Sequence, residues 1–303
     1  MPKSKYAGYE LDQSPFYCLR SQAKLAKLLQ VSQIKLKVLT HAEDLYMERD
    51  IILDPKRGKS RHVEEPKAVL KRLQKRIEEL LKRIKLPDYV HAPAKGRSYI
   101  SNAKAHVNAV VVRSLDIEKY FPSTPARRVY WFFHQRMKCS PDVAGILTKL
   151  STFKEHLPTG SPLSPMLSYF SHIDMWEAIS KIVECGNCNL TVYMDDVTIS
   201  GDHVPDKLIW QIKKQFYRCG LRNNRRKEKH YVGNKSCEVT GIIITRKGTL
   251  KLPNRQHLKI HEKRQSTRLE IEPETRNKLM QSLRGLEAQA QQIREANSPS
   301  IET

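Results

Sequence analysis

The sequence predicts an α+β fold with two or three lobes around a sizeable core. Residues 107–117 are rich in β-branched side chains, as in a buried strand, and residues 190–200 have the pattern of an apolar β-hairpin. Segments before and after these strands have helical periodicity. At 303 residues the chain is also longer than one ordinary domain.

The charge balance favours a polyanionic partner. Lysine and arginine outnumber aspartate and glutamate by 54 to 32, which gives a net charge of +22. Such an excess suits nucleic acid or an anionic membrane surface. No apolar run approaches the roughly 18–20 residues that span a bilayer, and the first residues do not resemble a signal peptide. We therefore expect a soluble, cytoplasmic protein that binds nucleic acid and no membrane.

The N-terminal part predicts helices followed by two strands. Residues 21–40 predict two short amphipathic helices, with Ser32 as the N-cap of the second. This pattern also resembles a DNA-binding helix-turn-helix, but the signal is only positional, so packing on the core is favoured. Residues 46–53 and 60–64 predict strands joined by a turn at 54–58.

A basic amphipathic helix is expected next. Pro66 suits its first turn, and apolar residues from Val69 to Ile84 recur at spacings of one, three and four before Pro87 ends the run. The opposite face is basic. Residues 207–235 hold ten lysines and arginines against one acid, which suggests a phosphate track.

The C-terminal part predicts one more strand and then helices. Residues 237–245 form an apolar run typical of a strand. The segment after Arg246 has a helical pattern and ends in a polar tail.

The six cysteines fit a reducing compartment. Cys185 and Cys188 form a CxxC pair, but no second ligand pair stands at zinc spacing. We interpret them as loop or core thiols rather than as a metal or redox site.

Three aspartates lie beside apolar strands. Asp116 ends the first strand, and Asp195 and Asp196 lie in the turn of the hairpin. An unpaired buried carboxylate is costly, and a divalent cation can compensate it. Two Mg²⁺ ions about 4 Å apart could activate a primer hydroxyl and stabilise a pyrophosphate leaving group. For an isolated Asp-Asp pair a simple polar turn is the better interpretation, so the neighbouring segments decide.

Those segments resemble reverse transcriptases. Tyr193-Met194-Asp195-Asp196 is similar to the catalytic box of that family, and SLDIEKYFPS (114–123) to its first aspartate motif. LPTGSPLSPMLSYF (157–170) resembles the loop that contacts template and nucleotide. The resemblance covers residues 45–245 and implies a right-hand polymerase with fingers, an antiparallel palm sheet and a helical thumb.

The resemblance also implies roles for individual residues at the centre of the site. Asp116 and Asp195 would hold two Mg²⁺ ions, Asp196 would complete the acidic site, and the backbone carbonyl of Ile117 would be a further ligand. Phe121 stands at the position of the steric gate, where a bulky ring excludes a 2′-hydroxyl. The other interpretation of Phe121 is a core aromatic, and one ring can serve both roles.

Further nucleotide contacts follow from the same resemblance. SRHVEEP resembles the basic fingers strand, which makes Arg61 a triphosphate ligand, because a guanidinium engages phosphate oxygens in pairs, with Lys59 assisting. GLRNNRRKEKH resembles the fourth palm motif and leaves Arg226 and Lys227 open as pyrophosphate contacts. Thr159, where many relatives have Gln, and Gly160 belong to the nucleotide-contacting loop.

Two more segments resemble the retron subgroup. Asn102 to His106 fits the NAxxH pattern of retron reverse transcriptases, and Val239-Thr240-Gly241 fits their VTG pattern. The resemblance makes Asn102, His106 and the VTG residues candidates to seat an RNA. Without this context, His106 would more often be a hydrogen-bonding structural histidine.

The implied domains are an N-terminal helical segment (1–44), fingers (45–113), a palm with insertions (114–245) and a thumb with a C-terminal tail (246–303). The implied reaction is synthesis of single-stranded DNA from deoxynucleoside triphosphates on a cognate structured noncoding RNA, primed from an internal RNA 2′-hydroxyl. The RNA–DNA product would act in anti-phage defence with a separate effector protein. The alternatives are another bacterial reverse transcriptase, such as a group II intron type, or a non-catalytic RNA-binding scaffold.

Overall fold

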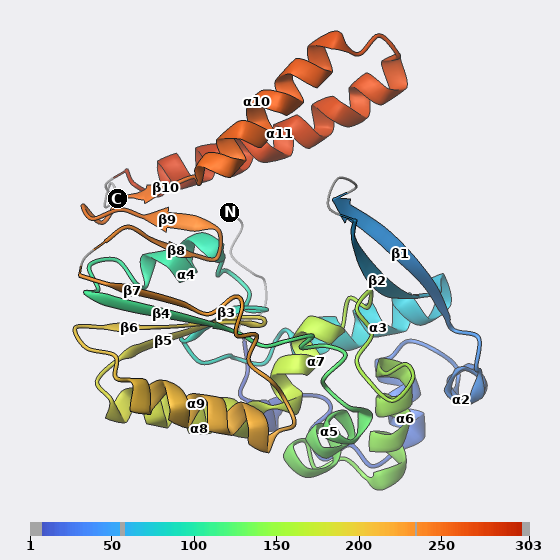
Figure 1. The fold of residues 1–303 in the computed structure, drawn as a ribbon. Coiled ribbons are helices and arrows are strands. Elements are labelled where there is room, and N and C mark those ends of the chain that lie inside the picture. The colour runs from blue at the N-terminus through green and yellow to red at the C-terminus, as the bar shows by residue number, and fades with distance from the viewer. Residues whose placement is uncertain (1–7, 55–57, 234, 299–303) are drawn as a thin grey trace.

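The structure is a computed structural model and describes residues 8–54, 58–233 and 235–298 (Figure 1). Its helical elements are η1 (Leu11–Gln13), α1 (Gln22–Leu28), α2 (Gln33–His41), α3 (Ala68–Leu81), α4 (Tyr99–Lys104), α5 (Ala126–Trp131), the π-helical η3 (Phe132–Arg136), α6 (Pro141–Ser151), α7 (Ser164–Ser171), α8 (Ile173–Cys185), α9 (Asp206–Arg218), α10 (Asn254–Leu269) and α11 (Pro273–Glu295). Its strands are β1 (Tyr46–Asp54), β2 (Lys59–Pro66), β3 (Val90–Ala92), β4 (Val111–Asp116), β5 (Asn189–Tyr193), β6 (Asp196–Gly201), β7 (Lys229–Val232), β8 (Cys237–Val239), β9 (Ile242–Ile244) and β10 (Leu250–Lys251). The predicted α+β class agrees with this mixture of helices and separate sheets.

The central sheet has five strands in the order β3-β5-β6-β4-β7. Its pairs are antiparallel except β3 with β5, which is parallel. The prediction of a wholly antiparallel sheet is therefore wrong for that pair. The reason is that β3 comes from a segment far earlier in the chain than β5, so no tight hairpin dictates its direction.

Two hydrophobic cores cover the two faces of this sheet. Helices α8 and α9 lie along one face, and α4 with the β8-β9-β10 sheet lies along the other (Figure 1). α9 buries Leu208, Ile209, Ile212 and Phe216 in the larger core, following its apolar spacing. The smaller core joins Ala103, Val112 and Val239 to Ile260 and Ile293 of the last two helices.

The ribbon β1–β2 confirms the two predicted strands before residue 66. Its register pairs Tyr46 with Pro66 and Asp50 with His62. The predicted turn at 54–58 lies largely outside the described residues, at 55–57. Pro66 ends β2, and α3 begins at Ala68 after its N-cap Lys67, so Pro66 precedes the first helical turn instead of occupying it.

Two predicted strands differ in extent. The strand expected from residue 107 begins only at Val111, because Asn108 has a positive φ of 68° and turns the chain first. The single strand expected over 237–245 is a hairpin of β8 and β9, with Thr240 and Gly241 at φ values of 45° and 78° in its turn. Two successive positive φ angles are typical of a tight hairpin turn.

The ends of the described chain are helical, as predicted. Ser32 caps α2 through the Lys35 N–H, and Leu25 and Leu36 pack into the larger core. Both helices thus pack on the core, as the simpler interpretation of residues 21–40 expects. At the other end, α10 and α11 pair as a long helical hairpin that projects from the small sheet (Figure 1).

None of the helices within the described ranges combines the length and apolarity that crossing a bilayer requires.

Candidate active site

The three aspartates meet where two central strands end. Asp116 is the last residue of β4 and lies opposite Asp196, the first residue of β6. Met194 and Asp195 form the two-residue turn between β5 and β6, with Met194 at φ 57°. The Ile117 N–H donates to the Asp195 carbonyl at 2.9 Å, which ties the turn to β4. Hairpin and strand thus hold the three carboxylates on one rigid scaffold.

Burial makes this acidic group unfavourable by itself. Asp116 is only 3% exposed. Burial raises the pKa of Asp195, and the Asp116 charge raises it further. Burial, then the neighbouring Asp195 and Asp116, raises the pKa of Asp196 to about 6. Clustered carboxylates with raised pKa values are what a divalent cation stabilises. The donor set therefore fits a divalent cation such as Mg²⁺.

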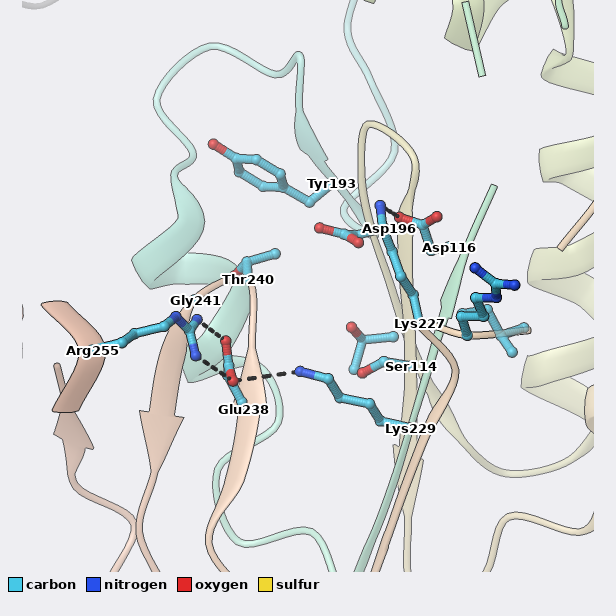
Figure 2. A pocket seen from close by; sticks show the side chains of 13 residues that line it. Ser114, Asp116, Tyr193, Asp196, Lys227, Lys229, Glu238, Thr240, Gly241 and Arg255 are labelled. Carbon is cyan, nitrogen blue, oxygen red and sulfur yellow. Dashed lines mark hydrogen bonds and ion pairs between the residues drawn. The ribbon is translucent and has the colours of Figure 1, made fainter. Parts of the chain in front are cut away.

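Lys227 is the cation that contacts this group. Its Nζ lies 2.7 Å from Asp116 Oδ2 (Figure 2). The hydrogen bond and charge of Asp116 raise the pKa of Lys227 against the opposing effect of partial burial. Arg226 lines cavities on both sides of this strand end but has no contact with the aspartates comparable to that of Lys227. The structure thus gives Lys227 a contact with the acidic group, and which of the two residues contacts pyrophosphate stays a prediction.

A first cavity of about 400 Å³ opens beside Asp116 and Asp196 (Figure 2). On its far side Glu238 accepts hydrogen bonds from Arg255 of α10 and forms an ion pair with Lys229 of β7 at 3.4 Å. The full lining is Ser114, Leu115, Asp116, Tyr193, Asp196, Thr198, Arg226, Lys227, Lys229, Glu238, Thr240, Gly241 and Arg255. This cavity brings the acids together with the VTG turn and the first C-terminal helix.

A second cavity of about 650 Å³ lies on the other side of the turn and includes Asp195. Arg61 of β2 faces it, and the Arg61 charge lowers the pKa of Asp195 against the effect of burial. Phe121 lines the same cavity and also packs against the larger core. Cationic and aromatic groups therefore converge here near one carboxylate. Lys59 begins β2, but its side chain lies outside the described residues.

Thr159 and Gly160 attach their loop to β2. Thr159 Oγ1 donates to the His62 carbonyl and accepts from the Glu64 N–H, both at 3.1 Å, while the residue lines the second cavity. A Cβ on Gly160 would stand 2.7 Å from the Glu64 carbonyl oxygen. Gly160 is therefore required for close packing of backbones. This contact gives Gly160 a structural role, and its predicted nucleotide contact stays a prediction.

Asn102 and His106 are buried. Each is 1% exposed. His106 hydrogen-bonds to Ser200 Oγ at 2.7 Å and Thr191 Oγ1 at 2.6 Å, and burial lowers its pKa to about 3. The neutral ring bridges β5 and β6 behind the catalytic hairpin. A direct RNA contact by either side chain does not agree with this burial, because neither presents surface to a ligand.

Of the VTG residues, only two reach the first cavity. Val239 is buried, whereas Thr240 and Gly241 line the cavity. Asn102 Nδ2 donates to Thr240 Oγ1, and Thr240 Oγ1 donates to the Tyr99 carbonyl, each at 3.2 Å. The two signature segments, 138 residues apart, are therefore one joint that positions the Thr240–Gly241 turn beside the acids.

Sequence reasoning missed two charged groups near these cavities. Glu238 and Arg255 form the wall described above. On the ribbon, Glu48, His62 and Glu64 hold potential metal-ligand atoms within 4.8 Å of one another. His62 hydrogen-bonds to Asp50 and Glu48, which raise its pKa. Alternation of these residues along two paired strands was the available signal, since alternate positions share a face.

The six cysteines are free. Cys185 is exposed at the end of α8, and the Cys188 thiol donates to backbone carbonyls of Gly186 and His203.

Comparison with known proteins identifies the class of this site. A family model described as "Reverse transcriptase (RNA-dependent DNA polymerase)" matches residues 52–244, well over half of the chain. The chain therefore belongs to the reverse transcriptase family.

Individual relatives point to one subgroup. The chain is 30% identical over 183 residues to the retron Se72 reverse transcriptase of Salmonella heidelberg, covering 59% of this chain and 47% of that protein. It is 27% identical over 180 residues to the retron Ec86 reverse transcriptase of Escherichia coli, covering 58% and 55%. A retron Mx162 reverse transcriptase of Myxococcus xanthus is 27% identical over 206 residues, covering 60% and 42%. The chain is thus similar to retron-type enzymes and spans about half the length of the curated relatives it matches.

Proposed function

We propose that the protein is an RNA-directed DNA polymerase of the retron type. The observation that carries this proposal is the meeting of Asp116, Asp195 and Asp196 between two cavities, in a chain of the reverse transcriptase family. In this proposal residues 45–113 act as fingers, 114–245 as palm and 246–303 as thumb, with 1–44 as a helical support. The small sheet crosses the last boundary, since β10 pairs with β9.

The three carboxylates would hold two Mg²⁺ ions, with the Ile117 carbonyl as a further ligand. When bound, such ions activate a hydroxyl nucleophile and stabilise the departing pyrophosphate. The raised pKa values of Asp195 and Asp196 support this assignment, because they record an acidic group that lacks sufficient positive charge.

The protein's own residues divide the substrate between the two cavities. The second cavity takes the deoxynucleoside triphosphate: Arg61 binds phosphate oxygens, and Phe121 packs under the sugar, where it excludes a 2′-hydroxyl. The first cavity takes the primer end. Once metal ions compensate the charge of Asp116, Lys227 would be free to bind phosphate oxygens of the nucleotide.

The retron assignment rests on similarity and on the joint between the two signature segments. In this proposal the template is a cognate structured noncoding RNA, and synthesis begins at the 2′-hydroxyl of an internal guanosine. The RNA–DNA product then acts with a separate effector in anti-phage defence. Asn102 contributes by holding the Thr240–Gly241 turn beside the first cavity, and His106 contributes by bridging β5 and β6.

One experiment tests the proposal as a whole. The protein is isolated from cells that carry its native locus, and the copurified nucleic acid is sequenced. The expected result is one structured RNA joined through an internal 2′-hydroxyl to single-stranded DNA. Recovery of unrelated RNAs with no attached DNA, from protein that extends an annealed primer, would contradict the retron assignment but leave the polymerase in place.

A further inference from the structure

The outer face of α9 carries two exposed aromatic rings. Trp210 is 51% and Tyr217 is 42% exposed. They are seven residues apart and so share one side of the helix, with ring centroids 6.3 Å apart. The opposite side of α9 supplies the core residues. About half of each side chain is left uncovered, on the face of α9 that does not pack into the core, and clustered exposed aromatics of this kind suit a ligand.

The surroundings of these rings are basic. Lys214 Nζ lies 5.5 Å from the centroid of the Trp210 ring. Two acids lie on or just after α9, and each pairs with a largely buried cation. Asp206 pairs with Arg113 at 2.8 Å, and Glu228 pairs with Lys213 at 2.8 Å. Exposed basic side chains follow along α9 and the loop after it, among them Lys207, Lys214, Arg218, Arg222, Arg225 and Arg226.

The aromatic face continues into the active site. Tyr217 lines a cavity of about 790 Å³ together with Glu118, Arg222 and the loop up to Arg226. Arg226 also lines the first cavity, which contains Asp116. A strand bound on α9 can therefore run along this loop to the catalytic carboxylates.

We propose that Trp210 and Tyr217 form a stacking platform for unpaired bases of RNA, whose phosphates bind Lys214 and Arg222. Aromatic rings among lysines and arginines are the usual means of holding single-stranded nucleic acid. Duplex RNA keeps its bases stacked inside and offers only phosphates and hydroxyls. A protein partner is disfavoured, because interface centres are depleted of charge and here the neighbouring exposed positions are basic or polar. The platform rests on the proposed function in that the bound strand belongs to the template RNA.

The test measures binding without catalysis. All variants carry Asp195→Asn and Asp196→Asn, and a fluorescein-labelled 20-nucleotide oligouridine is titrated at several salt concentrations. Trp210→Ala with Tyr217→Ala should weaken binding at least about 10-fold with little change in salt dependence. Trp210→Phe should retain most of the affinity. Lys214→Gln with Arg222→Gln should weaken binding and flatten the salt dependence. Ile34→Ala with Val38→Ala, which trims two exposed apolar side chains of α2, is the matched control and should change nothing.

A spectroscopic reading separates stacking from a general loss of fold. The chain has three tryptophans, of which Trp176 is fully buried. Oligouridine should quench the parent fluorescence, and Trp210→Phe should remove most of that quenching while keeping the thermal midpoint. Equal weakening for a 20-base-pair RNA duplex would overturn stacking. Binding equal to the parent in the Ala double variant would overturn the proposal.

The two proposals fail in different ways. Wild-type protein that extends no primer, yet loses oligouridine binding on removal of the two rings, would contradict the polymerase function and retain the platform. An active polymerase whose RNA affinity is unchanged by removal of the two rings would contradict the platform and retain the polymerase function.

Discussion

The hairpin that carries Asp195 and Asp196 and the NAxxH–VTG joint are both short motifs, yet their side chains lie in opposite surroundings. Asp196 lines the first cavity and Asp195 the second. The pKa of each carboxyl is raised, and a bound cation would lower it. Asn102 and His106 point into the interior, where their partners are other side chains of the protein. Burial and hydrogen-bond partners thus distinguish a motif that faces a cavity from one that joins parts of the fold.

The largest expected effect is on the chemical side. Asp195→Asn with Asp196→Asn should lower primer extension in Mg²⁺ by at least about 1000-fold, because the metal ligands are lost while the basic surface remains. Extension of an annealed primer and affinity for RNA are measured on the same folded sample. Substantial extension by this variant would rule out the proposed catalytic site.

On the architectural side, His106→Ala should lower the free energy of unfolding by about 2–4 kcal/mol, because Ser200 and Thr191 lose buried hydrogen-bond partners. Denaturant unfolding measures this change. Self-primed and annealed-primer synthesis should fall together, in proportion to the folded fraction. A fully stable variant that loses only self-primed synthesis would instead assign His106 to RNA recognition. It would contradict the purely structural role that its burial indicates.

The cost of burying the Asp196 carboxylate can be tested by measuring the stability of the folded protein. Asp196→Asn should stabilise the metal-free protein by on the order of 2 kcal/mol above about pH 7, because the ionised carboxylate is disfavoured there. Its folded pKa is raised, so wild-type stability from this group is full below the unfolded pKa and is lost as the pH rises through about 6. The advantage of Asn should therefore vanish near pH 4.

Thermal unfolding across this pH range is the measurement. Added Mg²⁺ should stabilise the wild type more than the variant, by mass action on the native state. An Asn variant no more stable than the wild type at pH 8 would mean that the Asp196 charge is already compensated without a metal ion.

The smallest effect is expected at Phe121. This residue combines a proposed chemical role with a packing role, because it lines the second cavity and also packs on the larger core. Phe121→Val should raise the ratio of ribonucleotide to deoxynucleotide incorporation about tenfold, since it opens space beneath the sugar. Single-nucleotide incorporation kinetics give this ratio. If an active variant keeps the wild-type ratio, Phe121 has only its packing role.

Much of the scaffold follows from local pattern. The ribbon, the hairpin carrying Asp195 and the amphipathic α3 were predictable because side-chain periodicity reports which face of an element is buried. The strand over 237–245 was predicted wrongly, because an apolar run does not reveal that Thr240 and Gly241 have positive φ angles.

By itself, the sequence determined the class of chemistry: three acids beside apolar strands, a net charge of +22, and segments in the order of a reverse transcriptase. Only the tertiary structure decided that Lys227, not Arg226, contacts Asp116, that β3 runs parallel to β5, and that Asn102 supports Thr240. The physical reason is that composition and period are local, whereas hydrogen-bond partners and burial depend on contacts between residues far apart in the chain. Asn102 and Thr240 are 138 positions apart, and no pattern within either segment encodes their meeting.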